Sequence, residues 1–164
     1  MKQKRCDGSS MHPGRPGSAP TNRDPDVQPQ NLTIESKTEH LIEVRDFISA
    51  AAREFGFSDE EVSKIALAID EACTNIIKHA YGFDPTQHIG ITIRAGNKTF
   101  EVLITDQGRQ FDPSAIPSPD MREYLTHFRR GGLGVYLMRS LMDKVEYSIR
   151  PGKNEVRLVK YLSR

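Results

Sequence analysis

The sequence predicts a single α+β domain: a two-layer α/β sandwich, with helices on one face of a mixed, mainly antiparallel sheet. Two observations support this class. Apolar residues recur at helical spacing in two neighbouring stretches of the first half, and alternating apolar residues then mark strands joined by short turns. A parallel, doubly wound sheet would instead require strands and helices to alternate along the chain.

The first 30 residues are expected to form a disordered tail, and residues 31–164 the folded domain. The tail combines Gly, Ser and Asp with almost no large apolar side chains, so it cannot bury enough surface to offset its ordering entropy. Alternation of Leu32 and Ile34 with polar neighbours then predicts a short strand. The prolines of the tail are Pro13, Pro16, Pro20, Pro25 and Pro29.

Two helices are expected between about residues 36 and 80. Ser36 followed by Glu39 resembles a capping box at the start of the first helix, and Gly56 closes that helix. A second capping box, Ser58 to Glu61, opens a longer helix. The apolar stripe of the longer helix comprises Val62, Ile65, Ala66, Ile69, Cys73, Ile76, Ile77 and Ala80.

Strands dominate the rest of the chain. Two alternating stretches, about 89–93 and 100–104, are joined by a hairpin turn at residues 95–98. Residues 107–131 have no regular pattern and contain three prolines, so we expect a lid or binding loop there. A helix follows Gly134, and two final strands, about 144–150 and 155–162, are joined by a turn at Pro151-Gly152.

Composition and charge argue against several classes of function. The formal net charge of +1 gives no sign of nucleic-acid or anionic-membrane binding. No apolar run approaches the roughly 20 residues that cross a bilayer, and the basic N-terminus lacks the apolar segment of a secretory signal. Cys6 and Cys73 form neither a disulfide framework nor a metal cluster. We therefore expect a cytoplasmic protein.

One polar pair on the longer helix suggests chemistry. Glu71 and Asn75 are four residues apart, so they share a face, which is turned away from the apolar stripe. A carboxylate can accept a proton, and an amide oxygen beside it can bind Mg²⁺, which prefers oxygen ligands and retains several waters. The polar face of an ordinary surface helix would look the same, so the pair alone decides nothing.

Two glycine-containing turns lie at the ends of other elements. Asp106 and Gly108 follow a strand, where they form either a simple turn or a pocket in which a buried carboxylate binds the amine of adenine. The glycines at 131, 132 and 134 precede a helix and suit a phosphate-binding turn. They match neither a Walker A loop nor a dinucleotide fingerprint, and they are equally consistent with a lid hinge.

The order of these motifs resembles the GHKL (Bergerat-fold) ATP-binding domain, and most closely its anti-sigma-factor serine/threonine kinase branch. The resemblance spans about residues 31–163, and the three motifs are specific in combination. They are Asp70-Glu71-Ala72-Cys73-Thr74-Asn75-Ile76-Ile77-Lys78-His79-Ala80-Tyr81, Asp106-Gln107-Gly108-Arg109-Gln110-Phe111-Asp112-Pro113 and Gly131-Gly132-Leu133-Gly134-Val135-Tyr136-Leu137-Met138.

The resemblance implies ATP and Mg²⁺ as cofactors, with Glu71 as general base and Asn75 as the magnesium ligand. It also implies phosphorylation of a STAS-type anti-anti-sigma factor, binding of a sigma factor and a possible homodimer. In phosphoryl transfer, most of the rate enhancement comes from positioning the reactants and neutralising the charge of the phosphates. By the same resemblance Asp106 would contact adenine, Gly108 would line its pocket, and Gly132, Leu133 and Gly134 would anchor the lid against the phosphates.

The chain departs from the family pattern at two places. Arg109-Gln110 stands where many members have a second glycine, and Asn154 or Glu155 replaces a threonine of the last strand. Three alternative functions therefore stay open: an ATP-responsive binding switch without kinase activity, the ATP domain of a histidine kinase, and a purely structural protein. The second requires a phospho-accepting histidine, but His40 is followed by Leu41 and not by an acidic residue.

Overall fold

The structure, a computed structural model, describes residues 28–110 and 133–163. The predicted tail, except for its last three residues, and the predicted lid from residue 111 onward lie outside this range. The first strand begins at Gln30, one residue before the predicted start of the domain. Within the described range, none of the helices combines the length and apolarity that crossing a membrane requires.

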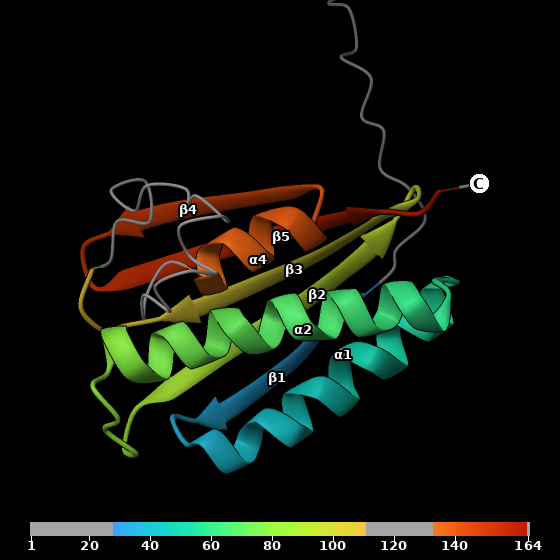
Figure 1. Cartoon of the computed structure of the whole chain (residues 1–164). Coiled ribbons are helices and arrows are strands. Elements are labelled where there is room, and N and C mark those ends of the chain that lie inside the picture. Colours follow the sequence, from blue (N-terminus) through green and yellow to red (C-terminus); the bar gives the residue numbers. More distant parts are fainter. Residues whose placement is uncertain (1–27, 111–132, 164) are drawn as a thin grey trace, which may run out of the picture.

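Five antiparallel strands form one sheet in the order β1-β2-β3-β5-β4, and the helices α1, α2 and α4 cover one face of it (Figure 1). The predicted α+β class is therefore confirmed, although every strand pair among the described residues is antiparallel and none is parallel. The elements are β1 Gln30–Glu35, a 3₁₀ turn η1 Thr38–His40, α1 Leu41–Phe55, α2 Asp59–Asn75, a π-helical turn η2 Ile76–Ala80, β2 His88–Gly96, β3 Thr99–Asp106, α4 Leu133–Leu141, β4 Lys144–Arg150 and β5 Lys153–Tyr161.

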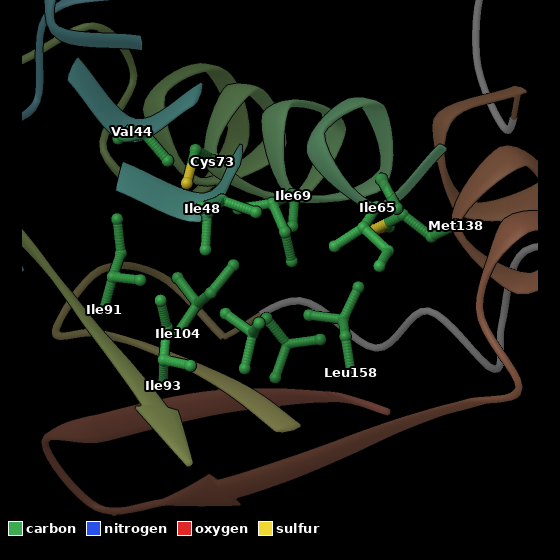
Figure 2. Packing of buried hydrophobic residues seen from close by; sticks show 14 of the residues in the cluster. Val44, Ile48, Ile65, Ile69, Cys73, Ile91, Ile93, Ile104, Met138 and Leu158 are labelled. Carbon is green, nitrogen blue, oxygen red and sulfur yellow. The ribbon is translucent and has the colours of Figure 1, made fainter. Parts of the chain in front are cut away.

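The core lies between the sheet and the helices (Figure 2). The alternating residues of β2 and β3 point inward as predicted, and burying each such side chain stabilises the fold by about 1.5–3 kcal/mol. On the helix side, Ile65, Ile69 and Cys73 of α2 are fully buried. The inward strand residues are Ile89, Ile91, Ile93, Phe100, Val102 and Ile104.

Helix α2 is buried on more than the predicted stripe. Ala66, which the pattern assigned to the stripe, is only half-buried, whereas Ala68 and Ala72 are buried. The reason is tertiary: α4 packs against α2 and covers a second side of it (Figure 1). A stripe inferred from one helix includes only the side that faces the sheet.

Of the two predicted capping boxes, one is confirmed and one is wrong. Ser58 Oγ accepts the N–H of Glu61 at 3.3 Å, and the Glu61 carboxylate accepts the N–H of Ser58 at 3.1 Å. Ser36 caps no helix, because its own N–H donates to the carbonyl of Gln87 and its side chain is buried. The 3₁₀ turn begins only at Thr38, with Lys37 before it.

Two predicted turns are confirmed by backbone geometry. Gly56 ends α1 with a φ of +109°, a left-handed conformation that favours glycine. The β2–β3 hairpin closes through Asn97 and Lys98, whose φ values of 47° and 61° give the two-residue turn that matches strand twist.

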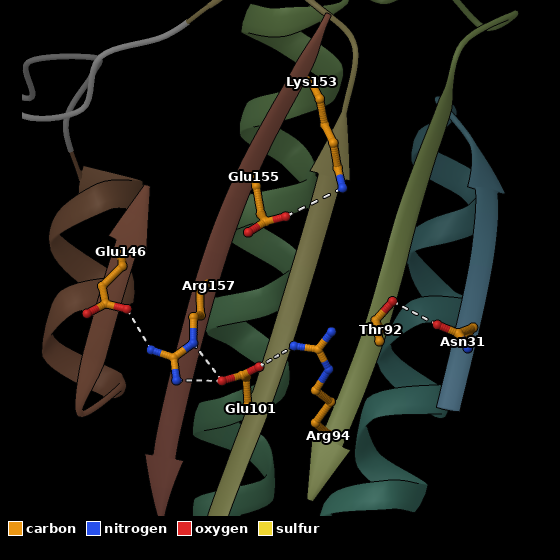
Figure 3. A network of polar contacts seen from close by, with 8 residues as sticks. All are labelled: Asn31, Thr92, Arg94, Glu101, Glu146, Lys153, Glu155 and Arg157. Atoms are coloured by element: carbon orange, nitrogen blue, oxygen red, sulfur yellow. Dashed lines mark hydrogen bonds and ion pairs between the residues drawn. The ribbon is translucent and has the colours of Figure 1, made fainter. Parts of the chain in front are cut away.

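The outer face of the sheet, away from the helices, carries charged side chains (Figure 3). Glu101 on β3 lies between Arg94 on β2 and Arg157 on β5, and Arg157 also contacts Glu146 on β4. Because strand residues alternate between faces, the same strands that bury isoleucines inward present these ion pairs outward.

The two serines allow a matched test of the caps. Ser58→Ala removes a cap that accepts a backbone N–H and should lower the free energy of unfolding by about 1 kcal/mol. Ser36→Ala removes a buried hydroxyl for which the described residues provide no hydrogen-bond partner, so stability should stay equal or rise. Urea unfolding of both variants measures the difference, and equal losses would contradict the assignment.

Candidate active site

The polar pair of α2 lies against the first turn of α4. Glu71 and Asn75 are half-buried, and a Cβ placed on Gly134 would stand 2.7 Å from Oε2 of Glu71 and 3.3 Å from Nδ2 of Asn75. Any side chain at position 134 would therefore push into the carboxylate and the amide. The pair is not the solvated face of a surface helix, since the backbone of a neighbouring helix covers it.

A π-helical turn directly follows Asn75. The N–H of Tyr81 donates to the carbonyl of Ile76 at 2.9 Å, five residues back, in place of the usual four. Such turns insert one extra residue and redirect the side chains after it, and they are frequent at functional sites. Here the turn brings the end of the helix to the strand end that carries Asp106, because the carbonyl of Ala80 accepts the N–H of Arg109 at 2.9 Å.

Tyr81 joins three segments at this point. Its hydroxyl donates to the carbonyl of His88 at 2.7 Å and accepts the N–H of Gln107 at 2.8 Å. Burial raises the pKa of the Tyr81 phenol, so the hydroxyl stays protonated and able to donate at neutral pH. The segment after Asp106 is thus tied to the helix end and to the start of β2.

Asp106 is a buried carboxylate with defined partners. It is 7% exposed, and its Oδ1 accepts the N–H of Gly108 and the side-chain amide of Asn154, each at 2.8 Å. Asn154 lies opposite Asp106 in the β3–β5 register, and its amide also donates to the carbonyl of Gly108 at 3.1 Å. Both of these hydrogen bonds end on Oδ1 of the carboxylate.

Gly108 is required for a local reason. A Cβ at this position would stand 2.6 Å from the carbonyl oxygen of Ala80, closer than real Cβ atoms approach backbone. The glycine therefore lets the loop after β3 pack directly on the end of the π-helical turn. Asp106 and Arg109 line one pocket of the structure, but Gly108 between them does not.

One pocket connects Asn75 of the helix pair to the buried carboxylate of Asp106. Asn75 and Asp106 both line it, so two predicted site residues from separate elements share a single cavity. Most of the other walls are apolar side chains of α2, α4, β4 and β5. The lining residues are Ala72, Asn75, Ile76, Ala80, Asp106, Arg109, Met138, Tyr147, Ser148, Ile149, Asn154, Glu155 and Val156.

The other predicted site residues do not line this pocket, or they lie outside the described part of the chain. Glu71 lies beside Asn75 and Gly134 but does not line the pocket. Leu133 is the first residue of α4 and half-buried, and Gly132 lies outside the described residues. The sequence analysis did not identify Tyr147 as a site residue. Its place in the pocket follows from the β4–β5 register, in which it lies opposite Val156.

Comparison with known proteins identifies the family. Residues 34–160 match the model of the histidine kinase-like ATPase domain. The serine-protein kinase RsbW of Halalkalibacterium halodurans is 34% identical over 125 residues, which cover 73% of this chain and 76% of that protein. RsbW of Bacillus licheniformis is 31% identical over 133 residues, covering 79% of this chain and 82% of that protein.

Solved structures share the fold at low sequence identity. The crystal structure of the RsbU and RsbW domains of a Mycobacterium tuberculosis protein superposes with a TM-score of 0.61 at 18% identity, and this chain spans 33% of it. A chain in the crystal structure of the SiaB–SiaC complex from Pseudomonas aeruginosa superposes with a TM-score of 0.61 at 14% identity, and the match covers 79% of this chain and 88% of that chain. The family model and the RsbW relatives together show that this chain belongs to the histidine kinase-like ATPase domain family, in the branch of the serine-protein kinases RsbW.

Proposed function

We propose that this protein is an anti-sigma factor and an ATP-dependent serine/threonine kinase, which phosphorylates a STAS-type anti-anti-sigma factor and regulates transcription by partner switching. The RsbW relatives support the reaction class. One observation supports the assignment to residues. Asn75 lies so close to Gly134 that a side chain at position 134 would crowd its amide, and Asn75 also shares a pocket with Asp106.

The adenine end of the site would lie at Asp106. A carboxylate held by two hydrogen bonds on Oδ1 presents its second oxygen as an acceptor, which suits an exocyclic amine. The apolar side chains of the pocket would contact the base, since ligand sites combine apolar walls with a few placed polar groups. Asn154, which with Glu155 stands where the family often has a threonine, supplies an amide donor to the Asp106 carboxylate.

The phosphate end would lie between α2 and α4. Asn75 offers an amide oxygen to Mg²⁺, and the described residues contain no cluster of three His, Cys, Asp or Glu side chains that would form an all-protein metal site. Bound magnesium would neutralise phosphate charge. Gly134, with Gly132 and Leu133 before it, would bring backbone N–H groups at the helix start close to the phosphates.

Glu71 would act as the general base. Its carboxylate is half-buried beside Asn75, one helical turn away, so it lies next to the proposed phosphate position. There it would accept the proton of the attacking serine hydroxyl, a role that contributes about 10²–10⁴-fold to such reactions.

The finer partner assignments belong to the same proposal. A sigma factor would be the second partner, bound when the anti-anti-sigma factor is absent. The protein would work in the cytoplasm, and the homodimer that the family resemblance implies belongs to the same proposal. An ATP-responsive switch without transfer is the second candidate, favoured by the departures at Arg109-Gln110 and Asn154.

Glu71→Gln tests the base. Transfer of label from ATP·Mg to a cognate STAS protein should fall by about 100-fold or more, while ATP affinity stays unchanged, because only the proton acceptor is lost. Glu60→Gln, an exposed residue of the same helix, is the matched control. Undiminished transfer would refute the base, and a wild-type chain that binds ATP without transferring label would favour the switch.

Asn75→Ala tests the metal ligand. In wild-type protein ATP affinity should be higher with Mg²⁺ than with a chelator, and the variant should lose this difference because the amide oxygen is gone. Calorimetric titrations under both conditions measure it, with the exposed Asn31→Ala as control. A variant that keeps full metal dependence would remove Asn75 from the site.

Asn154→Leu tests the support of Asp106. Losing a hydrogen bond to a charged group should weaken ATP binding by about tenfold. Asn154→Thr keeps a donor and should recover part of the affinity. The exposed Asn31→Leu on β1 should bind like wild type, and equal affinities for all three variants would show that the amide does not matter for the nucleotide.

A further inference from the structure

Tyr147 carries a buried hydroxyl that has no hydrogen-bond partner among residues 28–110 and 133–163. The residue lies in β4, opposite Val156 of β5, and its side chain lines the pocket that contains Asp106 and Asn75. The hydroxyl oxygen is inaccessible to water, and the described residues provide no hydrogen-bond partner for it. Most buried polar atoms in proteins have such a partner, so this exception calls for a physical explanation.

Leaving the group unpaired is costly for the free protein. A buried donor without an acceptor costs about 1–3 kcal/mol, and a phenylalanine would fill the same space without this loss. By contrast, the hydroxyl of Tyr81 makes two hydrogen bonds, one to the carbonyl of His88 and one from the N–H of Gln107. The two tyrosines therefore differ. The Tyr81 hydroxyl holds parts of the fold together, whereas the Tyr147 hydroxyl makes no hydrogen bond with the described residues.

The chemistry of the group is that of a donor. Burial raises the pKa of the Tyr147 phenol, and the positive charge of Arg139 on α4 opposes this only in part. The phenol therefore stays protonated at neutral pH and can donate to an acceptor. Asp106 offers the opposite chemistry, so the pocket contains both an acceptor and a donor.

The surroundings of Tyr147 suit the base and sugar part of a nucleotide more than its phosphates. Met138 and Val156 are buried apolar neighbours in the pocket lining, and Ile149, two residues along β4, is 42% exposed although it lines the same pocket. Glu71, next to the proposed phosphate position, does not line this pocket. β4 is also an edge strand of the described sheet, where β5 is its one pairing partner. A small movement of β4 that lets a ligand reach the Tyr147 hydroxyl would therefore disturb no second strand pair of that sheet.

We propose that Tyr147 is a nucleotide-binding residue, whose hydroxyl donates a hydrogen bond to an acceptor atom in the adenosine part of the bound nucleotide. This assignment rests on the proposed function, because it requires that the pocket binds an adenine nucleotide. It adds a contact from β4, a strand that contributes none of the three motifs of the family resemblance.

Tyr147→Phe separates ligand binding from folding, since it removes one oxygen and retains the ring. Affinity for ATP·Mg, and for ADP without metal, should fall by about fivefold, the effect of one neutral hydrogen bond. The melting temperature of the ligand-free variant should equal or exceed that of wild type, because an unpaired buried hydroxyl has been removed. Opposite signs in affinity and stability are not expected from a structural tyrosine.

Two further tyrosines serve as controls. Tyr81→Phe loses two hydrogen bonds and should lower the melting temperature, whereas the 42% exposed Tyr161→Phe should change neither measurement. Wild-type affinity in Tyr147→Phe would overturn the inference, as would a lowered melting temperature of its ligand-free form. A wild-type chain that binds neither ATP nor ADP would instead overturn the proposed function itself.

Discussion

The packing of α2 on two sides determines the geometry of the whole site. Ile65, Ile69 and Cys73 are buried in the core between the helix and the sheet, Ala68 and Ala72 are buried as well, and α4 packs against α2. These contacts fix the rotation of the helix about its axis. Because successive residues are 100° apart, a helix fixed in this way holds Glu71 and Asn75 against the first turn of α4.

Patterns that depend on a few consecutive residues were readable from the sequence. The Ser58 to Glu61 cap, the Glu71 and Asn75 pair, the hairpin and the alternating strands all depend on local spacing, and the structure contains each of them. The family resemblance added an order of motifs that no single pattern contains. The resemblance predicts that Asn75 and Asp106 belong to one site, and in the structure both residues line the same pocket.

Features set by distant parts of the chain were not readable. Ser36 lost its predicted capping role because Gln87, far along the chain, binds its backbone. The packing of α4 against α2 joins elements far apart in the chain, and the pairing of Asn154 with Asp106 depends on a strand register that joins positions 48 residues apart. Tyr147 belongs to the same group, since no spacing rule places a residue of the edge strand beside the end of α2.

The charged outer face of the sheet has a consequence for assembly. Arg94, Glu101, Arg157 and Glu146 satisfy one another across four strands while remaining in contact with water (Figure 3). A second molecule laid flat on this face would strip that hydration and gain little apolar contact in return. Docking of a protein partner on this hydrated, charged face is therefore unfavourable, and the helical layer or the edges of the sheet are better surfaces for it.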